Sequence, residues 1–233
     1  MVYRRLAQRL AQRLQTLLPA NCLCCESRGR GTFDLCAGCY RELPRNEVAC
    51  TVCALPVPSG QPRCGRCQAT PPSYTAVVAP WRYTEPVDWL IQALKFHGQL
   101  PAGRLLGMLL GRELLRRDGA DLIVPLPLHR QRLRERGFNQ AAEIARCLPA
   151  PLGIPLRHDA LRRARGTARQ SELGRHARRD NIRGAFSASR SVQGRRVAVV
   201  DDVVTTGSTV EEAARTLLRA GARDVVVWAV ARA

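Results

Sequence analysis

One short stretch near the C-terminus constrains the fold most, because it joins an apolar run to an amphipathic helical pattern through a polar loop. Residues 197–200 read Val-Ala-Val-Val, which is typical of a strand buried on both faces of a parallel sheet. Asp201 and Asp202 follow this run, and residues 210–220 have helical spacing closed by Gly221. The loop between them carries Thr205, Thr206, Gly207, Ser208 and Thr209. The stretch therefore predicts a strand-loop-helix unit of an α/β fold.

This polar loop has the chemistry of a site for a phosphorylated sugar. In open α/β sheets, ligands bind beyond the carboxyl ends of the strands, and a helix N-terminus offers backbone N–H groups to a phosphate. Neighbouring carboxylates accept hydrogen bonds from a diol and can help to hold Mg²⁺. The chain has no Gly-x-x-x-x-Gly-Lys-Ser/Thr pattern, which argues against a nucleoside triphosphate P-loop. Taken separately, the acids could cap the loop and the hydroxyls could cap the helix, but their combination favours a site.

The cysteines form an internal repeat in the N-terminal third of the chain. Nine of the ten lie between Cys22 and Cys67, and eight of these form four Cys-x-x-Cys pairs that begin fourteen residues apart. Two such pairs supply the four thiolates of a tetrahedral zinc site. We predict sequential pairing, with Cys22, Cys25, Cys36 and Cys39 on one ion and Cys50, Cys53, Cys64 and Cys67 on a second. An interleaved cross-brace is the alternative. Four thiolates leave no open coordination position, so both zinc ions are expected to be structural.

Disulfides and thiol redox pairs are the rival explanations of the cysteine pattern. Disulfides belong to exported proteins, but arginines at positions 4, 5, 9 and 13 interrupt any apolar core of a signal peptide. We therefore expect zinc and a cytoplasmic protein, and no apolar run is long enough for a transmembrane helix. Cys24 is surplus to the repeat and could be a ligand in a shifted register. Cys147 is expected to be a small core residue.

The chain is predicted to have three parts. Residues 1–19 have leucines at helical spacing between arginines, which indicates an amphipathic helix that packs on the protein's own body or, less favoured, on a membrane surface. Residues 20–69 form a double zinc ribbon, and a proline-containing linker precedes a domain over residues 74–233. In that domain, strands are predicted at 74–81, 121–127, 197–200 and 224–230, and helices at 87–96, 104–115, 138–148 and 210–220. This alternation predicts a parallel sheet flanked by helices.

The chain is strongly basic, with a formal net charge of +18. Residues 130–196 contain 17 arginines against five acids, a field that favours pyrophosphate in a cleft or a nucleic-acid backbone along a groove. Part of this excess could simply reflect an arginine-rich composition. Only Phe138 and Phe186 lie among these arginines, so a base-stacking surface has weak support. Lys95 is the single lysine among 37 basic side chains; it is either a solvated helix end or a cation for a phosphate.

Residues 199–209, Val-Val-Asp-Asp-Val-Val-Thr-Thr-Gly-Ser-Thr, resemble the phosphoribosyl pyrophosphate (PRPP) motif of type I phosphoribosyltransferases. The resemblance implies that Asp201 and Asp202 contact the ribose 2′- and 3′-hydroxyls. It also implies that residues 205–209 surround the 5′-phosphate.

Further segments resemble the ComF/GntX family of competence-associated proteins, and with the ribbons this resemblance covers nearly the whole chain. They are residues 94–98 (Leu-Lys-Phe-His-Gly), 125–130 (Pro-Leu-Pro-Leu-His-Arg), 134–140 (Arg-Glu-Arg-Gly-Phe-Asn-Gln) and the 167–186 region. The resemblance implies a type I phosphoribosyltransferase-like domain behind a double zinc ribbon, with residues 125–130 near the pyrophosphate and residues 167–170 in a loop over the site. It also implies single-stranded DNA and the DNA-uptake machinery of natural transformation as partners.

If the domain is catalytic, the reaction is displacement at ribose C1 with pyrophosphate leaving. Mg²⁺ and the cations Lys95, Arg130 and Arg134 would then stabilise the departing charge. His129 is the best candidate for a general base, although we favour an ordinary loop role for it. The sequence names no acceptor. The alternative is a non-catalytic single-stranded DNA-binding competence factor that retains the phosphoribosyltransferase fold.

Overall fold

The computed structural model describes residues 21–29, 33–117, 119–163 and 182–233. The chain divides into two compact units, residues 1–43 and residues 44–233. The first unit contains the first four ligand cysteines and helix α2 (Ala37–Arg41), whose N-cap is Cys36. The second unit contains the other four ligand cysteines together with the α/β domain. The division therefore falls between the two ribbons, whereas the sequence places both ribbons in one segment.

The second unit is built on a parallel sheet in the order β1-β7-β6-β3. These strands are β1 (Ala76–Val78), β7 (Asp224–Arg232), β6 (Arg196–Val204) and β3 (Leu122–Pro125). A further short strand, β2 (Trp81–Arg82), pairs with the end of β7 beyond β1. The strand predicted over residues 74–81 is thus present in two pieces, with Pro80, which has no N–H to donate, in the gap. Every pairing in this sheet is parallel, which confirms the predicted fold class.

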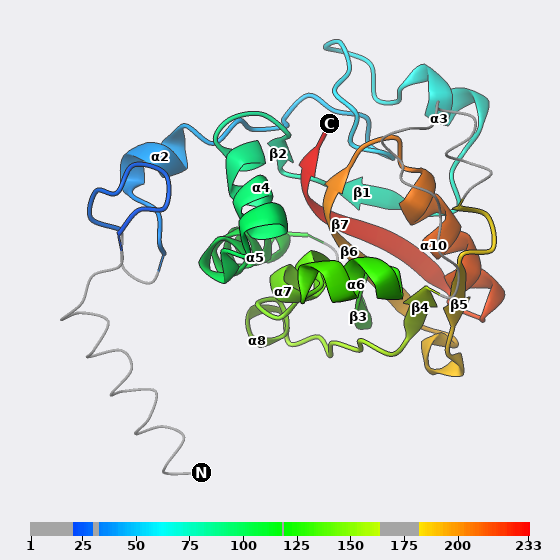
Figure 1. The fold of residues 1–233 in the computed structure, drawn as a ribbon. Coiled ribbons are helices and arrows are strands. Elements are labelled where there is room, and N and C mark those ends of the chain that lie inside the picture. Colours follow the sequence, from blue (N-terminus) through cyan, green and yellow to red (C-terminus); the bar gives the residue numbers. More distant parts are fainter. Residues whose placement is uncertain (1–20, 30–32, 118, 164–181) are drawn as a thin grey trace. The chain divides into compact units, whose positions relative to one another are not determined.

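Helices cover both faces of the sheet (Figure 1). The structure has α3 (Gly65–Ala69), α4 (Val87–His97), α5 (Leu100–Leu114), α6 (Arg130–Arg136), α7 (Gln140–Ala145), α8 (Pro149–Leu152), the 3₁₀ turn η1 (Arg190–Val192) and α10 (Ser208–Arg219). Helices α5 and α7 pack on one side of the sheet, and α10 packs on the other. On the α5 side, a Cβ at Gly107 would lie 2.4 Å from the carbonyl oxygen of Ile144, so only glycine allows α5 to approach α7 so closely.

The core on the α10 side extends into the second zinc ribbon. Side chains alternate between the two faces of β6, and Val197 and Val199 face the cluster that includes Ala213 and Leu217 of α10. All four cysteines of the second ribbon are buried in the same cluster. The second ribbon and the α/β domain therefore share one hydrophobic core.

Several elements differ from the sequence-based prediction. Helix α5 begins at Leu100 rather than residue 104, because Pro101 fits the first helical turn. Helix α7 is shorter than predicted and begins where the Asn139 side chain accepts a hydrogen bond from the Ala141 N–H. The sequence analysis predicted neither α6 nor the antiparallel pair β4 (Leu161–Arg163) and β5 (Phe186–Ala188).

Two predictions lie outside the described residues: the amphipathic helix over residues 1–19 and the loop over residues 167–170. Among the residues that are described, no helix has both the length and the apolar composition needed to cross a membrane.

Candidate functional site

The two adjacent acids lie inside strand β6. The strand continues to Val204, two residues beyond the acids, and Asp201 is in register with Ala229 of β7. Asp201 and Asp202 are only 9% and 3% exposed, and Asp201 Oδ1 accepts a hydrogen bond from the Asp202 N–H at 2.9 Å. Burial raises the pKa of Asp201 well above its ordinary value, and the neighbouring Asp202 carboxylate raises it further. The sheet thus holds two carboxyl groups side by side where one of them is costly to ionise.

The single lysine lies against these acids. Lys95, in the last turn of α4, forms an ion pair with Asp202. Its ammonium group therefore balances a buried carboxylate, and it is not a solvated helix end. Lys95 was predicted from the sequence to meet a phosphate, and no local pattern indicates its contact with Asp202, since 107 positions along the chain separate the two residues.

The acids form part of the wall of a cleft with a volume of about 770 Å³. The other walls come from the end of α4, the loop after β3, the cleft face of α6, and Thr205 and Thr209. A volume of this size lies within the range of small-molecule sites, roughly 300–1,000 Å³. The cleft lies at the carboxyl ends of parallel strands, which is where open α/β sheets bind their ligands.

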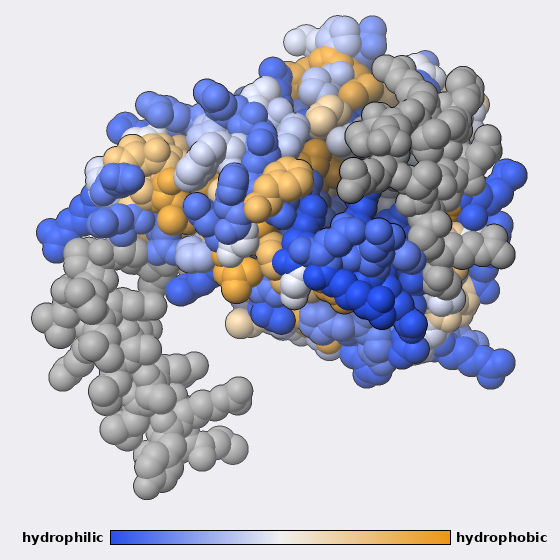
Figure 2. Space-filling model, viewed as in Figure 1, coloured by the Kyte–Doolittle hydropathy of each residue, from blue (hydrophilic) through white to orange (hydrophobic). Residues whose placement is uncertain are grey.

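Three arginines line the cleft: Arg132, Arg136 and Arg163. Arg130 and Arg134, which the sequence analysis selected, are not among the lining residues. The reason is that residues 130–136 form a helix, in which positions four apart share a face and positions two apart do not. Helical periodicity groups Arg130 with Arg134 and Arg132 with Arg136, but only the packing of α6 on its neighbours decides which pair faces the cleft. Figure 2 shows hydrophilic side chains gathered over α6.

Burial lowers the pKa of Arg136. Its guanidinium donates a hydrogen bond from Nη1 to Gln140 Oε1 at 2.7 Å and lies 5.7 Å from the centre of the Phe96 ring. Phe96 lines the cleft and is 69% exposed, although it is a large apolar side chain. Phe96 was not recognised from the sequence as an aromatic partner of the arginines, because Phe96 lies forty residues before Arg136.

The hydroxyl-rich loop encloses a smaller hollow of about 40 Å³, lined by Asp201 and residues 203–210. One ordered water occupies roughly 10–15 Å³, so the hollow has room for a group of a few heavy atoms, such as phosphate. Gly207 precedes α10 with a φ of 78°, a backbone conformation that favours glycine. The hydroxyls of Thr206 and Ser208 lie 3.1 Å apart. Asp201 lines both this hollow and the cleft, so the two spaces meet at that acid.

His129 occupies the position before α6. Its Nδ1 accepts a hydrogen bond from the Gln131 N–H at 3.4 Å, which makes the imidazole a helix cap. The local role that the sequence analysis favoured for His129 is therefore the one the structure supports.

The cysteines form two four-sulfur groups, each with all its sulfur atoms within 4.8 Å of one another. The members are Cys22, Cys25, Cys36 and Cys39 in one group and Cys50, Cys53, Cys64 and Cys67 in the other. The Sγ atoms of Cys25 and Cys36 are 3.7 Å apart, and those of Cys53 and Cys64 are 3.6 Å apart. A Zn–S length of about 2.3 Å gives a tetrahedron with edges of about 3.8 Å, so both groups fit zinc. The sequential pairing is confirmed, and all ten cysteines, each in a described segment, are free thiols.

One of these ligands, Cys36, has a backbone hydrogen bond that stabilises its thiolate. The Cys39 N–H donates a hydrogen bond to Cys36 Sγ at 3.4 Å, and this bond is the main reason why the pKa of Cys36 falls to about 6. A thiol that ionises easily is a better ligand for zinc at neutral pH.

Comparison with known proteins agrees with both halves of this description. Residues 13–68 match the family model of the double zinc ribbon domain, and residues 133–232 match that of the phosphoribosyl transferase domain. The DNA utilization protein YhgH of Escherichia coli K12 is 37% identical over 222 residues, which cover 92% of this chain and 98% of that protein. Competence protein F of Haemophilus influenzae is 35% identical over 210 residues, which cover 85% of this chain and 90% of that protein.

Among solved structures, a glutamine PRPP amidotransferase from Bacillus subtilis is 24% identical over 55% of this chain and 26% of that chain, with a TM-score of 0.39. The similarity to the two relatives extends from the ribbons through the α/β domain at more than one third identity. The chain belongs to the ComF/GntX family of competence-associated proteins, which combine a zinc ribbon with a phosphoribosyltransferase domain.

Proposed function

We propose that the cleft binds PRPP, with the ribose hydroxyls on Asp201 and Asp202 and the 5′-phosphate in the 205–209 loop. The observation that carries the proposal is the position of Asp201, which lines both the cleft and the loop hollow. A ribose 5-phosphate spans these two spaces if its diol meets the acids and its phosphate meets the N-terminus of α10.

The charges of the cleft suit the pyrophosphate group of the same ligand. Lys95, Arg132 and Arg136 line the cleft, and we assign the pyrophosphate to them in place of Arg130 and Arg134. Mg²⁺ bound with PRPP would neutralise part of the pyrophosphate charge, and the two carboxyl groups are oxygen donors of the kind that Mg²⁺ prefers. If the protein is an enzyme, these cations stabilise the departing pyrophosphate while the acids hold the ribose.

Calorimetric titration with PRPP and Mg²⁺ tests this site. Asp201→Asn should abolish binding, because the amide, unlike the carboxyl group, cannot lose a proton to offer two acceptor oxygens to the diol. Asp159→Asn is the matched control, since it makes the same substitution at an exposed acid paired with Arg157. Equal PRPP affinity in the wild type and Asp201→Asn would refute the assignment of the ribose site.

At the level of the cell, we propose that the protein acts in the cytoplasm in the uptake or use of external DNA. The support is the family, whose relatives carry the names competence protein and DNA utilization protein. Transformation frequency in a deletion strain complemented with wild type or Asp201→Asn would show whether the PRPP site serves this role. Full complementation by Asp201→Asn would show that the role in DNA uptake does not depend on the PRPP site.

A second candidate function is binding of single-stranded DNA. The observation that favours it is Phe96, an exposed aromatic ring beside Arg136 at the cleft, since stacked bases and arginines together bind single strands. Oligonucleotide affinity should fall roughly tenfold in Phe96→Ala and fall steeply with salt. Leu115→Ala removes an exposed apolar side chain elsewhere and is the control. Equal affinity of the two variants for the oligonucleotide would count against a stacking site at Phe96.

A further inference from the structure

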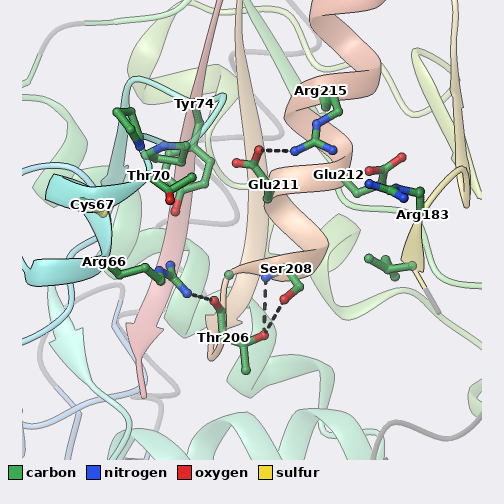
Figure 3. Close-up of a pocket in the computed structure, with 14 residues that line it drawn as sticks. Arg66, Cys67, Thr70, Tyr74, Arg183, Thr206, Ser208, Glu211, Glu212 and Arg215 are labelled. Atoms are coloured by element: carbon green, nitrogen blue, oxygen red, sulfur yellow. Dashed lines mark hydrogen bonds and ion pairs between the residues drawn. The ribbon is translucent and has the colours of Figure 1, made fainter. Parts of the chain in front are cut away.

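An arginine of the second zinc ribbon contacts the loop that we assign to the 5′-phosphate. Arg66 lies on α3 between the zinc ligands Cys64 and Cys67, and its Nη1 donates a hydrogen bond to the carbonyl oxygen of Thr206 at 2.5 Å (Figure 3). A Cβ at Gly207 would lie 3.2 Å from Arg66 Nη2, so the loop and the guanidinium are in close contact. The ribbon and the loop therefore meet directly.

A second arginine makes the same connection from the end of the sheet. Arg232 of β7 is only 3% exposed, and its Nε donates to the carbonyl oxygen of the zinc ligand Cys53 at 3.0 Å. Its Nη1 donates to the carbonyl oxygens of Val204 at 2.8 Å and Thr205 at 2.5 Å. One buried guanidinium thus holds a carbonyl of the ribbon and two carbonyls at the start of the loop.

These carbonyl contacts orient the loop's donors. In a planar trans peptide the C=O and the following N–H point in opposite directions. Because Arg66 donates a hydrogen bond to the Thr206 carbonyl oxygen, the Gly207 N–H points away from the ribbon. Because Arg232 donates a hydrogen bond to the Thr205 carbonyl oxygen, the Thr206 N–H points away from Arg232. N–H groups at this end of a helix are the ones that bind a phosphate.

The ribbon itself is held firmly enough to act as a support. Its four cysteines belong to the core on the α10 side of the sheet. The Val77 N–H of β1 donates to the carbonyl oxygen of Val52 at 2.8 Å, and Ser73 Oγ donates to Glu211 Oε1 of α10 at 2.7 Å. Arg66 and Thr206 themselves line a hollow of about 320 Å³ between α3 and α10, so little packing around their contact could replace it.

We propose that the second zinc ribbon is a positioning element of the phosphate loop, acting through Arg66 and Arg232. Zinc on Cys64 and Cys67 fixes α3 and hence Arg66, and zinc on Cys53 fixes the carbonyl that Arg232 binds. The first ribbon lies in the other compact unit, and we assign it no role in positioning the phosphate loop. This inference rests on the proposed PRPP site for the identity of the ligand, but the link between ribbon and loop can be measured without it.

The test compares Arg66→Ala with Arg63→Ala, because both residues are exposed arginines of the same ribbon and Arg63 lies outside the loop contact. Three quantities are measured on the full chain: bound zinc, PRPP affinity with Mg²⁺ by calorimetry, and hydrogen exchange of the amides of residues 203–209. Arg66→Ala should keep two zinc ions, exchange these amides faster and bind PRPP roughly three- to tenfold more weakly, as expected for one charged hydrogen bond. Arg66→Lys should recover part of the loss, and Arg63→Ala should match the wild type.

The inference is overturned if Arg66→Ala and Arg63→Ala exchange the loop amides at the same rate and bind PRPP equally. A wild type that binds no PRPP would refute the proposed function instead. In that case faster loop exchange in Arg66→Ala would still support the positioning role of the ribbon.

Discussion

The two zinc ribbons have the same ligand spacing but different surroundings. In the first, Cys25 is exposed and Cys36 and Cys39 are half-buried, whereas all four cysteines of the second are buried. The first ribbon belongs to a compact unit of its own, and the second shares the core of the α/β domain. The fourteen-residue repeat gives both ribbons the same four-cysteine ligand set, while the residues around each ribbon determine what that site supports.

The largest expected effect comes from removing equivalent ligands of the two sites. Cys53→Ser should lower the free energy of unfolding of the α/β domain by roughly 3 kcal/mol or more, because a structural zinc contributes directly to folding. Cys25→Ser, the matching change in the first ribbon, should leave that transition in place. Chemical denaturation followed by tryptophan fluorescence, with zinc content measured in parallel, checks both. Equal destabilisation of the domain by the two variants would remove the distinction between the ribbons.

Arg232→Met should lower the free energy of unfolding by roughly 2–3 kcal/mol, because it leaves the buried carbonyl contacts to Cys53 and Val204, and the part-buried one to Thr205, without their charged donor. It should also speed the release of zinc to a chelator from the second site but not from the first. Arg82→Met, on the neighbouring strand β2 and exposed, is the control. Release that is equally fast from both sites would show that Arg232 does not support the second ribbon specifically.

Asp201→Asn changes the stability of the protein through the ligand site and not through the zinc ribbons. Burial and Asp202 raise the pKa of Asp201 in the folded state. The folded protein therefore still holds a proton that the unfolded chain releases near pH 4. As a result, the free energy of unfolding falls as the pH rises from about 4 through the pKa that Asp201 has in the folded protein. The variant should lack this fall and be roughly 1 kcal/mol more stable at neutral pH, with both zinc ions kept. Unfolding measured from pH 4 to pH 8 tests this. A variant no more stable than the wild type at pH 8 would argue against the raised pKa.

The smallest expected effect concerns the linker after the second ribbon. Glu211→Gln weakens the hydrogen bonds from the N–H and the hydroxyl of Ser73 and should cost roughly 0.5–1 kcal/mol in unfolding free energy. Glu42→Gln, an exposed change in the first unit, should cost nothing measurable. Thermal unfolding of both variants provides the measurement, and no difference between them would mean that the linker adds nothing to the attachment of the second ribbon.

Local patterns in the sequence predicted most of the fold. The apolar runs of β6 and β7, the α10 pattern and the spacing of the ligand cysteines were sufficient for the sheet and for the sequential zinc pairing. These features are local, because strand burial, helical period and knuckle spacing are each contained within a few residues.

The missed features depend on contacts between distant residues. Arg66 and Thr206 are 140 positions apart, and no periodicity relates them. The prolines of the linker suggested a separation between ribbon and domain, yet Ser73 directly after them is bonded to α10. On α6, the arginines that line the cleft are Arg132 and Arg136 and not Arg130 and Arg134, because the helical period alone does not say which face of the helix meets the cleft.

The most direct test of the central claim is a calorimetric titration of PRPP with Mg²⁺ into Cys25→Ser and Arg66→Ala, each compared with the wild type. If the second ribbon alone positions the phosphate loop, Cys25→Ser should bind PRPP with wild-type affinity and Arg66→Ala should bind it roughly three- to tenfold more weakly. Weakening of equal size in the two variants, or unchanged affinity in Arg66→Ala, would contradict the claim.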